Sequence, residues 1–160
     1  MTLYVVFLFL AIYNAGCMTT LQLQHYGIYP SVGKANFAAY MRANNRAAAV
    51  PTILPALSLL LVSIVLMVYR PGFVRPYEAT AGLVLNLVAL GSTFVWQRRI
   101  QGELAETGYD EQKIHTLIMT NWIRTAAHLL LAILVIMILL RVLAPRLLFC
   151  FLILHLDVHN

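Results

Sequence analysis

Polar side chains that interrupt long apolar stretches are the groups in this sequence that could do chemistry. Four of them follow one another at the spacing i, i+3, i+4 and i+7, on one face of a helix: Asn121, Arg124, Thr125 and His128. Histidine titrates near neutral pH and can act as a base, and an arginine beside an amide can stabilise a developing oxyanion. The candidates for a catalytic role are therefore Arg124, His128 and His25, which lies near the end of the first apolar stretch.

The other apolar stretches carry polar faces of the same kind. By helical spacing, the first face contains Asn14, Cys17, Met18, Gln24 and His25; the second contains Tyr40, Asn44 and Ser58; and the third contains Asn86, Thr93 and Gln97. Polar groups in membrane segments usually face protein, water or a ligand, so these faces predict a cavity with a polar mouth. The residues expected to bind a ligand there are His25, Asn44, Gln97, Asn121, Arg124, Thr125 and His128. The alternative is that the same side chains form ordinary hydrogen bonds between helices.

The two histidines among these residues also raise the question of a metal or cofactor. Four-helix bundles bind haem and metals through residues on facing helices, so His25 and His128 are candidate ligands for a haem or a pigment. Neither histidine belongs to an HxxxH or ExxH motif, and the carboxylates lie in connections or at the edges of apolar stretches, with Glu78 nearest to an exception. This pattern excludes a carboxylate-bridged two-metal centre and leaves the cofactor unknown.

The composition decides which class of protein must position these groups. Of the 160 residues, 61% are hydrophobic and 11% are charged, and the mean hydropathy is +0.81. A short soluble domain cannot bury that much apolar surface, so a soluble enzyme is disfavoured. The net charge of +5 comes from Lys and Arg scattered at the ends of apolar runs rather than from a basic stripe, so nucleic acid is not an expected partner. The sequence predicts an integral membrane protein in contact with the lipid bilayer.

The pattern of apolar stretches predicts an all-α, up-down four-helix bundle. About 20 apolar residues are needed to cross a bilayer as a helix, and four stretches qualify: 3–23, 51–69, 77–96 and 122–143, the last ending before Pro145. Residues 35–50 and 99–106 have helical composition and extend the helices on the side of the two long connections. Gly108 breaks the second of these extensions, and Asp110 is the expected N-cap of the next helix. Residues 1–146 then form the bundle, and residues 147–160 form an apolar tail, interfacial or in contact with a partner.

The distribution of cations predicts an orientation. Seven Lys and Arg residues belong to the long-connection side, which carries Lys34, Arg42, Arg46, Arg98, Arg99, Lys113 and Arg124. Four belong to the other side, which carries Arg70, Arg75, Arg141 and Arg146. By the positive-inside rule, the long connections are expected in the cytoplasm and both termini outside.

Two segments of the sequence resemble a known family. The stretch from Leu21 to Pro30, followed by Val32-Gly33 and Phe37-Ala38-Ala39-Tyr40, resembles the first connection of a bacterial family of small four-span membrane proteins of unknown function. Gly108-Tyr109-Asp110 and the later Asn121-Trp122-Ile123-Arg124-Thr125 are similar to that family's most recognisable signature. The resemblance covers residues 1–142 and implies the four-span fold, the bacterial inner membrane and a distant relation to anthrone-oxygenase-like proteins.

The same resemblance bears on activity. Relatives carry a histidine in the region 40–46, an acidic residue in the second span and a histidine after the third. This chain has Asn44 or Asn45, Ser58 and the segment 97–100 at those places. We therefore expect a non-catalytic subunit of a larger membrane complex, such as one for electron transfer, that packs against other subunits or holds a lipophilic small molecule. The alternative is a small oxidoreductase or oxygenase acting on a quinone-like or aromatic substrate.

Overall fold

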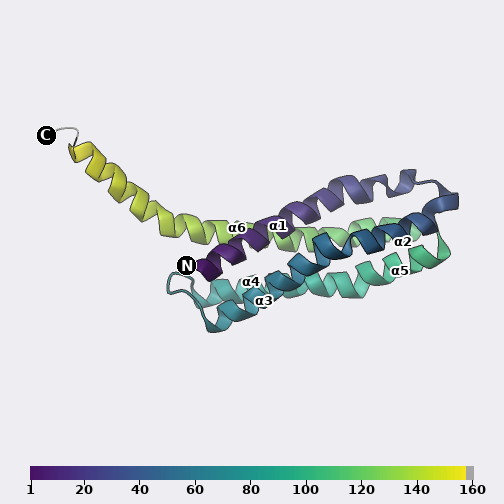
Figure 1. Ribbon diagram of the computed structural model, residues 1–160, viewed down its shortest axis with the longest axis horizontal. Helices are drawn as coiled ribbons and strands as arrows, with labels where there is room; N and C mark the ends of the chain where they lie inside the picture. The colour runs from purple at the N-terminus through teal and green to yellow at the C-terminus, as the bar shows by residue number, and fades with distance from the viewer. Residues whose placement is uncertain (158–160) are drawn as a thin grey trace.

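The protein is an antiparallel bundle of four long helical segments. The computed structural model describes the backbone of residues 1–157 and the side chains of residues 1–145. Within these residues the helices are α1 (Thr2–Thr20), α2 (Phe37–Ala47), α3 (Leu54–Val68), α4 (Pro76–Ser92), α5 (Arg98–Thr107) and α6 (Glu111–Asp157). Figure 1 shows α2 leading into α3 and α4 into α5, so that both extensions lie at the end with the long connections. The all-α prediction is confirmed.

Four helical segments are long and apolar enough to span a membrane. They are Thr2–Ser31, Ala49–Val68, Pro76–Thr107 and Glu111–Pro145. At most 33% of the most apolar window of each segment is buried inside the protein, so the outer surface of the bundle is itself apolar. Trp96 and Trp122 are exposed on this surface near the long-connection end, where a membrane–water interface favours tryptophan. These features fit an integral membrane protein.

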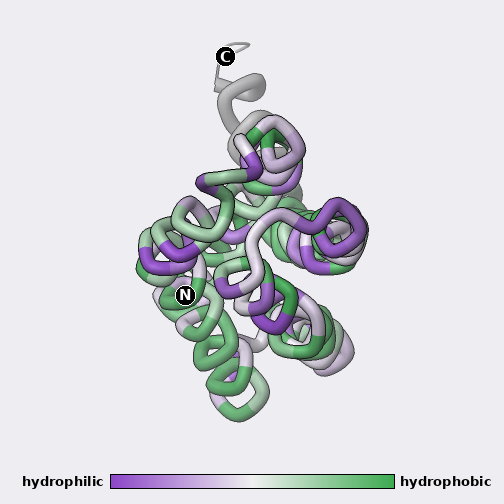
Figure 2. The backbone as a smooth tube through the Cα atoms, turned by 90° about the vertical axis from the view of Figure 1, so that its right-hand side faces the viewer, coloured by the Kyte–Doolittle hydropathy of each residue, from purple (hydrophilic) through white to green (hydrophobic). Residues whose placement is uncertain are grey.

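The interior has two apolar cores separated by polar side chains. The core at the end with the termini contains Tyr4, Phe7, Leu59, Leu131 and Val135, among others. The core at the long-connection end contains Tyr26, Tyr29, Phe37, Leu104 and Leu117, among others. The end that carries α2 and α5 therefore has a core of its own. Figure 2 views the molecule from this end, with hydrophilic stretches on several of the nearest turns.

Three helical segments are widened by a π turn, which contains one residue more than the corresponding α-helical turn. The π turns are Leu21–His25, Ala49–Ile53 and Thr93–Gln97. The first one corrects a prediction from the sequence, because regular spacing placed Gln24 on the buried face. In the structure Gln24 is exposed, and Gln22, which follows the buried Asn14 and Met18 at intervals of four residues, is buried instead.

Two prolines lie at the second π turn and free backbone carbonyls there. Because Pro55 has no N–H, the carbonyl of Pro51, four residues earlier, cannot accept its helical hydrogen bond. That carbonyl accepts a hydrogen bond from the Tyr13 hydroxyl (3.1 Å), and the Cys17 thiol lies 3.9 Å from it. The carbonyl of Pro55 accepts from Asn14 Nδ2 (3.3 Å). Side chains of α1 thus satisfy carbonyls of the proline-containing segment, as a membrane requires.

The boundaries of α6 confirm one prediction and correct another. Gly108 has φ 87° after α5, and the backbone N–H of Lys113 donates to Asp110 Oδ1 (3.0 Å), which makes Asp110 an N-cap. We expected the helix to end before Pro145, but Pro145 lies inside α6, which continues to Asp157. Figure 1 shows α6 bending in this region, the consequence expected of a proline without an N–H. The tail expected at 147–160 is thus a continuation of α6 up to Asp157; its side chains and residues 158–160 lie outside the described part of the structure.

A partly buried ion pair joins α4 to α6 at the end with the termini. Glu78, only 5% exposed, receives both terminal nitrogens of Arg141, with Nη2 of Arg141 2.9 Å from Glu78 Oε2. The same guanidinium donates to the carbonyl of Phe73 (2.8 Å), and Glu78 also accepts from the backbone N–H of Arg75 (2.8 Å). The carboxylate therefore caps α4 and ties it to α6. The sequence showed Glu78 at the edge of a span but did not indicate its partner.

Gly82 lets α4 pack closely against two other helices. A Cβ atom at this position would lie 3.2 Å from Phe7 Cζ and 3.5 Å from Leu131 Cδ1, whereas one at Gly91 on the same helix would meet nothing within 4 Å. We expect Gly82→Leu to lower the free energy of unfolding by about 1–2 kcal/mol through overpacking. Gly91→Leu should be neutral or slightly stabilising, because leucine is the better helix former. Thermal unfolding in detergent, followed by tryptophan fluorescence, compares the two; equal effects would contradict the close packing.

Candidate functional site

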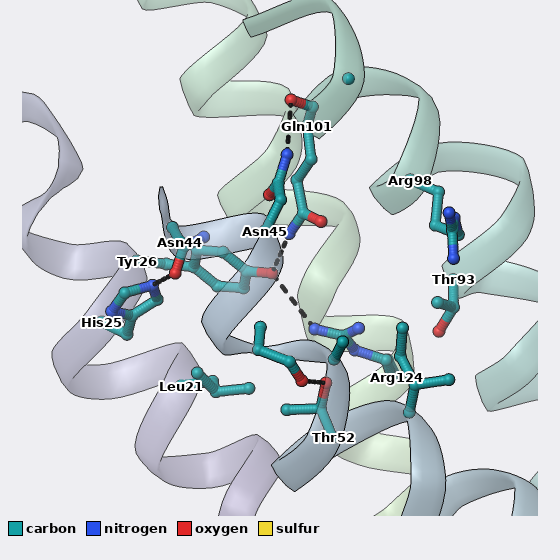
Figure 3. A pocket seen from close by; sticks show the side chains of 14 residues that line it. Leu21, His25, Tyr26, Asn44, Asn45, Thr52, Thr93, Arg98, Gln101 and Arg124 are labelled. Carbon is teal, nitrogen blue, oxygen red and sulfur yellow. Dashed lines mark hydrogen bonds between the residues drawn. The ribbon is translucent and has the colours of Figure 1, made fainter. Parts of the chain in front are cut away.

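A cavity of about 270 Å³ lies among the polar side chains at the long-connection end. All four helical segments contribute to its wall, and each of the three π turns supplies at least one lining residue. Its polar lining consists of His25, Tyr26, Asn44, Asn45, Thr52, Thr93, Arg98, Gln101 and Arg124, most of which are visible in Figure 3. We call it the polar cavity. π turns occur frequently at functional sites, and three at one cavity make it the first candidate for a site in this chain.

The Tyr26 hydroxyl joins three helices at the wall of this cavity. It accepts hydrogen bonds from Gln101 Nε2 (2.9 Å) and Arg124 Nη2 (3.2 Å), and it donates to Gln97 Oε1 (3.4 Å). Figure 3 shows the Arg124 guanidinium directed at this hydroxyl, with Arg98 on the other side of the cavity. Because Tyr26 is itself buried, these contacts hold Arg124 in one orientation.

His25, Tyr29 and Asn44 form a second polar group beside the cavity. A carbonyl oxygen only accepts hydrogen bonds, so His25 Nε2 donates to Asn44 Oδ1 (2.7 Å). Asn44 Nδ2 donates to the Tyr29 hydroxyl (2.9 Å), which lies 3.2 Å from His25 Nε2. The ring of Tyr40 lies 6.4 Å from that of His25, and burial raises the pKa of the Tyr40 phenol. The polar side chains of this group therefore bond to one another, and Nε2 of His25 already has a hydrogen-bond partner.

A smaller cavity of about 40 Å³ adjoins the first one on the side of the membrane. The two share five lining residues, Thr52, Ile53, Thr93, Arg98 and Arg124. Its other walls are mostly apolar, among them Ala56, Leu57, Leu90 and Phe94, so we call it the apolar cavity. His128, 2% exposed and one helical turn beyond Arg124, lies at this cavity, and its Nδ1 has no hydrogen-bond partner among the described residues. The polar and the apolar cavity thus form one path from a polar to an apolar environment.

Arg124 is the buried charged group at the junction of the two cavities, whereas Arg98 is exposed. The Arg124 side chain is 8% exposed, and the hydrogen bond to Tyr26 is the one that its guanidinium makes among the described residues. Its Nε has no partner there, and no ion pair of the described part of the chain includes it. No carboxylate lines either cavity. Buried cations are normally paired, so this one lacks the anion that its burial calls for.

The seven residues predicted to bind a ligand divide into two groups. His25, Asn44 and Arg124 line the polar cavity, and Arg124 and His128 line the apolar cavity. Gln97, Asn121 and Thr125 line neither and instead join helices. Gln97 donates to Thr120 Oγ1 (2.9 Å), Asn121 donates to Gln22, and Thr125 donates to the carbonyl of Met18 (3.5 Å). These three residues therefore follow the alternative given above: they form hydrogen bonds between helices.

Sequence reasoning missed several residues of the polar cavity. Tyr26, Asn45, Thr52, Arg98 and Gln101 were not among the predicted site residues, yet all five line it. Tyr26 was missed because it lies directly after the first π turn, whose extra residue changes which positions are buried. Tyr4, Ala11 and Met18 are buried at intervals of seven, which puts His25 at the next buried position; the extra residue puts Tyr26 there instead.

The described residues contain no group of three or more His, Cys, Asp or Glu that could hold a metal ion. His25 and His128, the candidate haem or pigment ligands, lie at different cavities, with the nitrogen of His25 nearest the polar cavity bonded to Asn44. The sequence matches no family model, no curated protein and no solved structure.

Proposed function

We propose that the protein is a non-catalytic integral membrane subunit that holds a lipophilic ligand in the polar and apolar cavities. The observation that carries this proposal is the change of lining on the two sides of Arg98 and Arg124: amides, a tyrosine and a histidine on one side, and mostly alanine, leucine and phenylalanine, with His128, on the other. Such a gradient suits a molecule with a polar group at one end and an apolar body at the other. The widened helices support it further, because π turns open space between segments that would otherwise pack closely.

The part that the protein plays in a larger assembly is also a proposal. The bundle exposes large apolar side chains along every membrane segment, for example Phe9, Leu61, Phe94 and Met137, which suits lipid and apolar faces of other subunits equally. Helix α6 runs on past Pro145 and offers a further surface to a partner. From the cation distribution and the resemblance to bacterial four-span proteins, we propose the bacterial inner membrane, with the long connections in the cytoplasm.

One observation favours the alternative of a small oxidoreductase for quinone-like or aromatic substrates. Because His25 donates through Nε2 to Asn44, its Nδ1 is the ring nitrogen that could accept a proton from a bound phenol. The oxidoreductase hypothesis predicts that His25→Ala abolishes turnover of a quinol while the protein remains folded.

An absorption spectrum of the gently extracted protein tests the related haem or pigment hypothesis, since a Soret or pigment band would support His25 and His128 as ligands.

Filling the polar cavity tests the main proposal. Gly102 lines this cavity, and a Cβ there meets nothing within 4 Å, so the ring of Gly102→Phe can enter the cavity without a clash at Cβ. We expect this variant to bind oleate and oleyl alcohol at least about tenfold more weakly than the wild type, because the ring takes the ligand's place. The measurement is equilibrium binding of the labelled probes to protein in phosphatidylcholine nanodiscs.

The control is Gly91→Phe, which introduces the same ring on the adjoining helix at an exposed position that lines neither cavity. This variant should bind both probes as the wild type does. If neither probe binds the wild type, or if Gly102→Phe and Gly91→Phe bind them equally, the protein does not hold a lipophilic ligand in these cavities.

A further inference from the structure

The unpaired cation between the two cavities identifies the class of ligand. Resting on the function proposed above, we infer that the ligand is an acidic single-chain amphiphile. Its carboxylate or phosphate is bound by Arg124 in the polar cavity, and its chain passes through the apolar cavity to the lipid.

The first argument is the state of Arg124 itself. The guanidinium has five N–H donors, of which the described residues use one, for the Tyr26 hydroxyl at 3.2 Å. Its Nε is buried without a partner. A planar guanidinium binds a carboxylate or a phosphate through two parallel hydrogen bonds, and the unused N–H groups of the terminal nitrogens, Nη1 and Nη2, provide that pair. A neutral lipophile would leave the buried charge uncompensated.

The second argument is the sign of the charge around the site. Arg98 is an exposed residue that lines both cavities together with Arg124, and no carboxylate of the described residues lines either cavity. Glu103, on the same helix as Arg98, pairs with Arg99 and Lys113 on a different surface. The cavity therefore has two cations and no anion in its lining, which attracts an acid rather than a base or a zwitterion.

The third argument is position relative to the bilayer. Trp96 and Trp122 are exposed within a few residues of Arg98 and Arg124, at the level where tryptophan marks the membrane interface. Acidic groups of membrane amphiphiles lie at this level. In the apolar cavity, the lining residues Leu57 and Phe94 are also exposed on the outer surface, one from α3 and one from the π turn after α4. A chain can therefore pass between these two segments into the lipid.

The volume of the two cavities limits the ligand to one hydrocarbon chain. A volume of about 270 Å³ lies at the lower end of the range for small-molecule pockets, and the apolar cavity adds about 40 Å³. This space suits the acid group and the first part of one chain, with the remainder in the bilayer. It does not suit the branched head of a two-chain lipid.

The test compares ligands that differ only in their head. Labelled oleate is bound to the wild-type protein in phosphatidylcholine nanodiscs at pH 8, and it is displaced by oleyl alcohol, by 1-oleoyl lysophosphatidate or by inorganic phosphate. We expect oleate and the lysophosphatidate to bind about 10- to 100-fold more tightly than oleyl alcohol, the usual effect of a charge-assisted hydrogen-bond pair. Inorganic phosphate should not displace oleate, because it lacks the chain. Displacement by phosphate at similar concentrations would show a site for a free anion and overturn the amphiphile.

Variants of Arg124 then locate the effect. Arg124→Gln should reduce oleate affinity about 10- to 100-fold and leave oleyl alcohol unchanged, and Arg124→Lys, which keeps the charge, should retain part of the preference for the acid. Oleyl alcohol binding as tightly as oleate to the wild type would overturn the inference without any variant and would leave the proposed function intact. Loss of binding of both probes to the wild type would instead reject the proposed function.

Discussion

Glu78→Gln should lower the melting temperature of the protein by roughly 5 °C or more in detergent. The substitution keeps the acceptor for the backbone N–H of Arg75, so the cap of α4 survives. It removes the negative charge that faces the Arg141 guanidinium, and it replaces Oε1, the acceptor of Arg141 Nη1, with an amide group that cannot accept. Glu78 is 5% exposed and the Arg141 side chain 34%, so water can compensate the arginine only in part. Thermal unfolding followed by tryptophan fluorescence measures the shift.

Two further variants separate the ion pair from a general effect of charge. Glu103→Gln breaks exposed ion pairs with Arg99 and Lys113 and should change the melting temperature little. Glu78→Gln combined with Arg141→Met should be less destabilised than the sum of the single variants, since the second change removes the charge that the first leaves unpaired. Additive effects in this double-mutant cycle would mean that the two side chains are not coupled.

Unlike Glu78→Gln, which destabilises the protein, Arg124→Gln should stabilise the ligand-free protein by about 2 kcal/mol, or roughly 4–8 °C in melting temperature. Burial of an unpaired guanidinium costs several kcal/mol, and the hydrogen bond to Tyr26 offsets only part of that cost. Glutamine removes the charge, while Gln101 still donates to the Tyr26 hydroxyl. The expected variant is thus more stable and binds an acid less well, the combination typical of a residue kept for function.

The measurement is a melting temperature of delipidated protein in an uncharged detergent, with and without oleate. Arg98→Gln is the matched control, because it removes a cation from the same cavities at an exposed position, and it should leave the melting temperature nearly unchanged. Oleate should raise the melting temperature of the wild type more than that of Arg124→Gln. Destabilisation of the ligand-free protein by Arg124→Gln would show that the guanidinium has a structural role instead.

The fold was largely predictable from the sequence because its signals are local. The four apolar segments follow from length and hydropathy, and the cap at Asp110 follows from residue type next to a glycine break. The shared face of Asn121, Arg124, Thr125 and His128 follows from regular spacing, and all four are buried because no π turn interrupts α6 at that point. Hydropathy does not disclose that Pro145 lies inside a helix, because α6 accommodates this proline by bending.

The site was less predictable because its residues depend on helix register and on pairs distant in the chain. Regular spacing predicted the burial of Gln97 from that of Asn86, but the first π turn moves the buried position from His25 to Tyr26. The partner of Glu78 is 63 residues away, and hydrogen bonds of Tyr26 reach residues up to 98 positions distant. No local pattern in the chain identifies such contacts.

The three π turns have a consequence for the comparison of this chain with distant homologues. Each turn amounts to a one-residue insertion within a helix, so a homologue with regular helices would lack one residue in each of the first three membrane segments. An alignment that permits gaps only in loops would then place every residue beyond these points one column out of register, about 100° around the helix. His25 would be aligned with the wrong neighbour, and so would Gln97. Single-residue gaps inside helices are therefore the signature by which relatives that share this cavity should be sought.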